Sequence, residues 1–388
     1  MKTLSLVVAG LLASQVVTAN EVKNDWTLNG NIRTAFISDT NDKKGSEEIH
    51  DLATGGSITL LTPQVKGFKV GATLYTSQPL LGQQSNGFFT EKNGGGSYSY
   101  LGEAYIAGTA FGKTSVILGR KVIDTPFANP DDIGMTPNSF EVYLVQNNDI
   151  ENITFTAGRV LKWSGIDAPT RGKFTDLTNG DGVSVVAVNY ADKDLGLEAQ
   201  AWYYHLDNFV ATQDVGISYV DSTYSFTIDE KTALAVSAQF AKFQHINGDE
   251  IDGSVIGAKA DLTFDDLTLG FAYNQADGDI APLNGFGGGP FYASADLLTI
   301  ADSGQDSTAW RISGGYDIDS QTSVSFGYAG LTPKNGSDLS EIDFSASYTY
   351  DKDLSLDLYV ESFTRQQDTD IEKTDAYFEY SIFANYSF

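Results

Sequence analysis

The last stretch of the chain, Tyr377-Phe378-Glu379-Tyr380-Ser381-Ile382-Phe383-Ala384-Asn385-Tyr386-Ser387-Phe388, indicates the fold class. Successive side chains of a strand point to opposite faces, so alternate positions form two sets. The apolar set is Tyr380, Ile382, Ala384, Tyr386 and Phe388, the polar set is Glu379, Ser381, Asn385 and Ser387, and Phe383 breaks the alternation. The segment 353–364 alternates in the same way. A membrane barrel has one lipid-facing and one water-facing side, although a soluble sandwich shows the same period.

Segment length and aromatic placement favour the barrel over the sandwich. The alternating segments run to roughly 10–12 residues, which matches a tilted strand crossing the hydrocarbon layer and exceeds the usual globular strand. Aromatic side chains stand at segment ends, as the interface girdles of a barrel require. Examples are Trp26 and Phe36, Phe264 and Tyr273, and Tyr348 and Tyr350.

The connections alternate between short turns and long loops, which also favours a barrel. Short turns such as Phe111-Gly112-Lys113 and Asp351-Lys352-Asp353 are predicted to face the periplasm. Counting between turns gives about 18 strands, an even number, as closed bacterial barrels require. The segments lie near 26–38, 54–62, 67–77, 100–109, 114–121, 140–147, 152–162, 182–190, 195–205, 212–227, 232–243, 253–264, 267–275, 308–317, 321–330, 340–350, 353–364 and 374–388. We therefore expect an all-β fold, a closed transmembrane antiparallel β-barrel.

The N-terminus has the pattern of a secretory signal peptide. Met1-Lys2-Thr3 is followed by an apolar run from Leu4 to Val17 and by the small-residue site Val17-Thr18-Ala19. Residues 1–19 are therefore predicted to be a signal peptide, and residues 20–388 a single barrel domain. The export signal and the barrel pattern together predict the outer membrane of a Gram-negative bacterium.

Composition excludes several functions. The 51 Asp and Glu against 24 Lys and Arg argue against a nucleic-acid partner, because the phosphate backbone would be repelled. With no Cys, the chain has no thiolate metal site, disulfide or cysteine nucleophile. The three His residues, His50, His205 and His245, lie at strand ends or in loops without a nucleophile nearby in sequence. We expect no enzyme activity, no cofactor and no metal site.

The stretch from Leu118 to Glu141 differs from its surroundings. Three of the 9 prolines, Pro126, Pro130 and Pro137, fall within it. A connection this long and stiff, after the fifth strand, predicts that the third long loop, residues 122–140, folds inward and constricts the lumen. The run Gly285-Phe286-Gly287-Gly288-Gly289-Pro290, in contrast, is interpreted as a flexible part of the longest surface loop.

This stretch resembles the third loop of OprD-type outer-membrane porins. The resemblance rests on Gly119-Arg120, Asp124-Thr125-Pro126, Asn129-Pro130-Asp131-Asp132 and Pro137-Asn138-Ser139-Phe140-Glu141, with Gly102-Glu103-Ala104-Tyr105 upstream. It implies an 18-stranded barrel that passes small solutes, often with a ladder of Arg and Lys guiding carboxylates past the inward loop. This chain departs from the family at Ile133-Gly134, where members tend to carry an Arg, and at Val142, where they tend to carry Gly.

Strand alternation predicts which charges face the lumen. The bases are Arg33, Lys69, Lys259 and Arg311, and the acids are Glu103, Glu198, Asp261, Asp343, Asp357, Glu361, Asp375 and Glu379. Arg120 shares its parity with apolar neighbours, but a bulge at Gly119 could turn its side chain inward. For Arg159 the sequence does not decide whether the side chain faces the lumen or the lipid. The predicted constriction and selectivity residues are Arg33, Lys69, Glu103, Arg120, Asp124, Asp131, Asp132, Glu141 and Arg311. The loop acids are expected to contact lumen bases such as Arg120, and the excess of acids predicts a preference for cations at low salt.

We therefore expect an outer-membrane porin for passive diffusion of ions and small hydrophilic solutes. The alternative is a structural or adhesive surface barrel with little transport role. Expected partners are these solutes, outer-membrane lipid and lipopolysaccharide, the barrel-assembly machinery and, in a homotrimer, two further copies of the chain.

Overall fold

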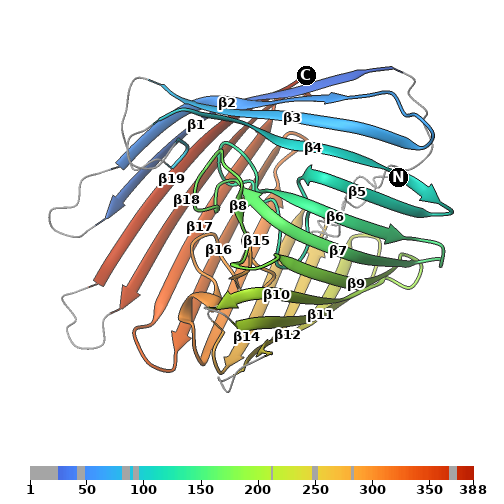
Figure 1. The fold of residues 1–388 in the computed structure, drawn as a ribbon. Helices are drawn as coiled ribbons and strands as arrows, with labels where there is room; N and C mark the ends of the chain where they lie inside the picture. Colours follow the sequence, from blue (N-terminus) through green and yellow to red (C-terminus); the bar gives the residue numbers. More distant parts are fainter. Residues whose placement is uncertain are drawn as a thin grey trace.

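The computed structural model describes residues 25–41, 49–80, 88–90, 96–210, 213–246, 252–280, 284–366 and 374–388. Its strands form one antiparallel sheet of 19 strands that closes on itself (Figure 1). The strands are β1 (Thr27–Asn41), β2 (Ile49–Leu61), β3 (Phe68–Pro79), β4 (Tyr98–Phe111), β5 (Thr114–Lys121), β6 (Ser139–Asn147), β7 (Ile153–Ser164), β8 (Thr175–Asp176), β9 (Val183–Asp192), β10 (Leu197–Val210), β11 (Gln213–Thr227), β12 (Thr232–His245), β13 (Gly253–Phe264), β14 (Leu267–Asp277), β15 (Ser307–Asp317), β16 (Thr322–Pro333), β17 (Leu339–Thr349), β18 (Leu354–Gln366) and β19 (Thr374–Ser387). Because the two-residue β8 lies in a loop, 18 strands form the wall, and the prediction of a closed barrel of about 18 strands is confirmed.

The barrel closes where the first strand pairs with the last. The register places Ile32 opposite Tyr386, and beyond it Gly30 and Phe388 exchange backbone hydrogen bonds of 2.9 Å in both directions. The Phe388 ring lies directly over Gly30, so a Cβ at that position would collide with it. The aromatic C-terminus is therefore part of the closure, which leaves no open edge in the sheet.

The two faces of the last strand follow the sequence pattern. Ile382, Tyr386 and Phe388 are about half exposed on the outside, whereas Ser381 faces inward and is buried. Phe383, which breaks the pattern, is also buried, and its ring packs against Phe89 at 5.5 Å between ring centres. Large apolar residues are exposed on the outer face along the whole wall, as a lipid-facing band requires.

Most predicted strand bounds differ from the structure by a few residues, and β10 ends at Val210 where the prediction was 205. The second strand was predicted near 54–62, but β2 already begins at Ile49 and continues the pairing with β1. The strand β6 begins at Ser139, so the third loop, called L3 below, covers residues 122–138. Among the described residues, no helix has the length and apolarity to cross a membrane.

Candidate functional site: the loop constriction

L3 crosses the lumen instead of covering the barrel from outside. At its start, the Val122 N–H donates to the Glu103 carboxylate on β4 at 3.3 Å. On the far side, Asp132 accepts two hydrogen bonds from Arg33 on β1, at 2.7 and 3.1 Å. In between, Phe127 is buried against Tyr219 on β11, and β11 lies on the opposite side of the barrel from β1. The prediction that L3 folds inward is confirmed.

A second loop joins L3 inside the barrel. This loop, L7, comprises residues 278–306, of which 281–283 lie outside the described residues. The Phe286 N–H donates to the Phe127 carbonyl at 2.9 Å, and the Asn129 N–H donates to the Phe286 carbonyl at 3.2 Å. The Phe286 ring also packs on Trp163 of β7, with 5.4 Å between ring centres. The interpretation of 285–290 as a flexible surface segment is wrong, because its glycines let the backbone lie flat against L3.

Three of the predicted residues, together with Lys121, form two ion pairs around the base of L3. Arg120 pairs with Glu141 on the neighbouring strand at 3.5 Å, and its guanidinium carbon lies 4.2 Å from the centre of the Phe174 ring. Glu103 pairs instead with Lys121, also at 3.5 Å. Arg120 therefore pairs with a strand residue, whereas the L3 acid Asp132 contacts another of the predicted lumen bases. Arg33 takes that role, because it lies opposite the loop tip and reaches both Asp132 and the Gly134 carbonyl.

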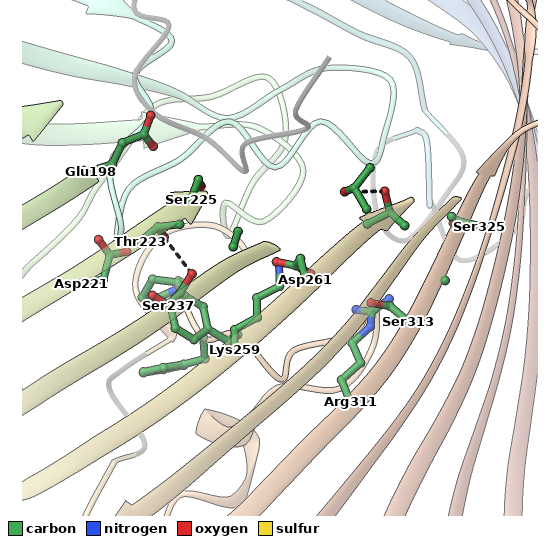
Figure 2. A pocket seen from close by; sticks show the side chains of 18 of the residues that line it. Glu198, Asp221, Thr223, Ser225, Ser237, Lys259, Asp261, Arg311, Ser313 and Ser325 are labelled. Carbon is green, nitrogen blue, oxygen red and sulfur yellow. Dashed lines mark hydrogen bonds and ion pairs between the residues drawn. The ribbon is translucent and has the colours of Figure 1, made fainter. Parts of the chain in front are cut away.

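Arg311 of β15 holds L7. Its guanidinium pairs with Asp343 at 2.7 Å and also donates to the Ser294 carbonyl of L7. The two side chains come from β15 and β17 and meet over Gly327 of the intervening strand β16. A Cβ at Gly327 would overlap both of them. A cavity of about 910 Å³ opens beside it, lined by acids, hydroxyls, Lys259 and Arg311 from β10 to β16 (Figure 2).

Two further predicted acids lie on L3 itself. Asp124 lines the cavity, and burial raises its pKa. Burial, followed by the nearby Asp167 carboxylate, raises the pKa of Asp131 to about 7. Lys69 lies half-buried near the periplasmic end of β3 and forms no ion pair with any described residue.

A group of buried acidic side chains lines the part of the wall opposite Phe127, the residue by which L3 packs on β11. This group is called the buried acidic face below. Glu341 is fully buried and accepts two hydrogen bonds of 3.1 Å from the Leu297 N–H of L7. Glu361 lies beside Asp296 of L7 and near Glu379. The remaining buried acids of this face are Asp39 and Asp343.

Some of these residues were found by alternation and others were missed. Asp343, Glu361 and Glu379 were predicted to face the lumen, and the side chain of Asp375 lies outside the described residues. Glu341 shares its parity with Asp343, and Lys121 lies opposite Glu103, so alternation could have found both. Asp296 has no such signal, because its position depends on how L7 folds.

Comparison with known proteins agrees with this architecture. The family model described as "outer membrane porin, OprD family" matches residues 23–335. Among curated protein sequences, none matches this chain significantly.

Solved porin structures share the fold at low sequence identity. Pseudomonas aeruginosa OccK9 (OpdG) aligns with a TM-score of 0.78 at 15% identity, covering 94% of this chain and 98% of its own. Acinetobacter baumannii OccAB1 aligns with a TM-score of 0.77 at 17% identity, covering 95% and 98%. Pseudomonas aeruginosa OpdQ aligns with a TM-score of 0.75 at 15% identity, covering 94% and 99%. The family model spans most of the chain, and the barrel with its inward loop has the corresponding fold: the chain belongs to the OprD family of outer membrane porins.

Proposed function

We propose that this porin is a cation-preferring diffusion channel with L3 and L7 as its constriction. As a member of its family, the chain forms an outer-membrane channel for small hydrophilic solutes and is not an enzyme. The cation preference rests on one observation: most lumen bases are already paired, while acids remain in excess. The pairs are Arg33–Asp132, Arg120–Glu141, Lys121–Glu103, Lys259–Asp261 and Arg311–Asp343.

The excess acids lie on both sides of the constriction. Asp124, Glu198 and Asp221 line the cavity, and Glu341, Glu361 and Glu379 belong to the opposite face. Among the predicted lumen bases, Lys69 forms no ion pair with a described residue. Charges at a narrow point set selectivity more than the total does. A passing cation therefore meets the carboxylates that line the cavity, while an anion meets bases whose charge is already balanced.

The test is the zero-current potential of the purified channel in a planar bilayer with a tenfold KCl gradient. We expect cation preference at low salt that fades as salt rises, because the Debye length falls from about 30 Å at 0.01 M to about 3 Å at 1 M. Anion preference at low salt would contradict the proposal. A folded barrel that does not conduct would favour the structural or adhesive alternative.

A carboxylate-selective channel is the competing proposal within the family. The solved structure of Pseudomonas aeruginosa OpdK was determined with vanillate. If this chain passed such anions, Arg33, Lys69, Arg120 and Arg311 would be the first residues to substitute. The pairing of Arg33, Arg120 and Arg311 with acids supports the cation proposal instead.

Three further proposals concern assembly. Residues 1–19 lie outside the described residues, and we propose that they are removed as a signal peptide, which N-terminal sequencing of the mature protein would test.

We propose that the barrel-assembly machinery recognises the final strand, so that deleting Phe388 lowers the amount of protein in the outer membrane more than Phe378→Ala does. A homotrimer is also proposed, with sedimentation of the detergent-solubilised protein as its test.

A further inference from the structure

A charged cluster lies at the extracellular ends of β10 and β11, on the outer face of the wall. Trp202, Tyr204 and Leu206 of β10 are buried on the lumen side, so His205 and Asp207 share the outer face with the exposed Tyr203. Across the hairpin, Gly216 lies opposite His205, and a Cβ there would contact the Tyr203 hydroxyl. Asp214 lies two residues from Gly216 and therefore belongs to the same outer face. No contact of the cluster with L3 or L7 is seen among the described residues, but its backbone touches the loop that precedes β9, where the Asp207 N–H donates to the Gly182 carbonyl at 3.1 Å.

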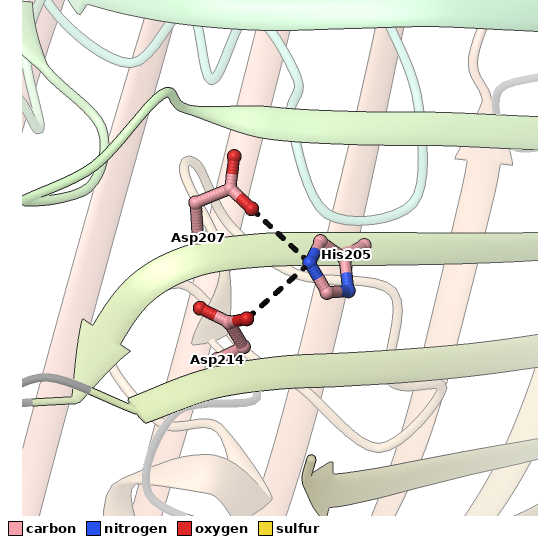
Figure 3. Close-up of side chains that lie close together, drawn as sticks. All are labelled: His205, Asp207 and Asp214. Carbon is pink, nitrogen blue, oxygen red and sulfur yellow. Dashed lines mark ion pairs between the residues drawn. The ribbon is translucent and has the colours of Figure 1, made fainter. Parts of the chain in front are cut away.

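The three side chains converge on one point (Figure 3). The His205 Nε2 atom lies 3.1 Å from Asp207 Oδ1 and 3.7 Å from Asp214 Oδ2. One ligand atom from each residue lies within 4.8 Å of the other two. Ligands 2.0–2.1 Å from a tetrahedral zinc ion are about 3.3 Å from one another. The His205 distances bracket that separation, so small side-chain movements would complete a coordination sphere.

The second oxygen of each carboxylate is held by another group. Arg159 Nη2 donates to Asp207 Oδ2 at 2.6 Å, and the Asn208 N–H donates to Asp214 Oδ1 at 2.9 Å. These bonds turn the remaining oxygens, Asp207 Oδ1 and Asp214 Oδ2, toward His205. Partners that orient metal ligands in this way are a regular part of metal sites. With Arg159 included, the two carboxylates leave one net negative charge to attract a cation.

We propose that His205, Asp207 and Asp214 bind a first-row divalent transition metal such as Zn²⁺. An imidazole among the ligands favours zinc, copper or nickel, whereas calcium and magnesium prefer six or more oxygen ligands. Three protein ligands leave a fourth position for water. Because the site lies on the outer face, a bound ion does not enter the channel.

The binding test uses the purified full-length protein, stripped of metal, titrated calorimetrically with ZnCl₂ and separately with MgCl₂. We expect one Zn²⁺ per chain and no comparable Mg²⁺ binding. His205→Ala and the shape-conserving Asp214→Asn should each weaken Zn²⁺ binding by at least roughly tenfold. His245→Ala, at the end of β12, is the matched control and should bind like the parent. Heat-modifiable gel mobility checks that every variant is a folded barrel.

Several results would overturn the proposal. The first is that the folded parent does not bind Zn²⁺, which would leave the cluster as an ion pair between His205 and the two carboxylates. The second is that His205→Ala binds Zn²⁺ as well as the parent. The third is that His245→Ala loses Zn²⁺ binding. Saturating Zn²⁺ is expected to leave the single-channel conductance unchanged. A Zn²⁺ block that His205→Ala removes would place the ion in the lumen and would also overturn the outer-face site.

Discussion

Two sides of the lumen hold the inward loops by different forces. On the side of β10 and β11, Phe127 packs with its ring centre 5.6 Å from that of Tyr204 and 5.7 Å from that of Tyr219. On the side of β15 to β19 and β1, the loops are held by Arg33, Arg311 and Glu341 through ion pairs and hydrogen bonds. Apolar packing depends little on salt, whereas exposed ion pairs are screened. The apolar side therefore fixes where the loops lie, and the polar side sets the charge of the passage.

Deleting residues 127–136 removes the loop that connects the two sides and should have the largest effect. We expect single-channel conductance to rise roughly twofold or more, because a barrel of this size encloses a water-filled lumen once its inward loop is gone. Planar-bilayer recording of the inserted variant measures this. Unchanged conductance would mean that L3 does not narrow the channel.

Phe127→Ala tests the apolar anchor alone. Replacing a buried Phe with Ala costs about 3–5 kcal/mol of stability. Here the substitution destabilises the conformation in which L3 is packed against the wall. Amide hydrogen exchange over 122–138 should become much faster, and the conductance should become noisier. Phe155→Ala on the outer face of β7, where Phe155 is 41% exposed, is the control and should leave L3 exchange unchanged.

Glu341→Ala tests the polar anchor and should have a smaller effect. The lost hydrogen bonds from the Leu297 N–H are worth about 0.5–1.5 kcal/mol each. Exchange around Leu297 should quicken while L3 stays protected. Glu341→Gln keeps a carbonyl acceptor and should restore most of the protection; equal loss in both variants would show that the anchor is not this hydrogen bond.

The smallest effect is expected from pH, through Asp131. Its pKa is raised from 3.8 to about 7, so folding of L3 favours the protonated acid. That contribution is fully present below pH about 4 and is lost as pH rises through about 7. Hydrogen exchange of L3, corrected for the intrinsic rate, should quicken across this range in the parent and change less in Asp131→Asn. A pH response of equal size in both proteins would assign it to another group.

The sequence carries more information about the wall than about the interior. Alternation placed Ile382 and Tyr386 outside and Asp343 inside, because a strand in a closed barrel has one lipid face and one lumen face. Proline spacing also indicated that L3 folds inward. Contact of an L3 acid with a lumen base was predicted, but not that the base would be Arg33, because sequence distance says nothing about which wall strand meets a loop tip. The packing of Phe286 on L3 was missed for the same reason.

The sequence by itself determined the barrel, its strand number, the inward third loop and the excess of acids. These depend on local period and composition, which each segment carries on its own. Only the tertiary structure decided that Arg33 binds Asp132, that Gly327 lets Arg311 reach Asp343, and that His205 meets Asp214 across a hairpin. Such contacts depend on register around a closed sheet, where a shift of one residue would turn each side chain to the other face.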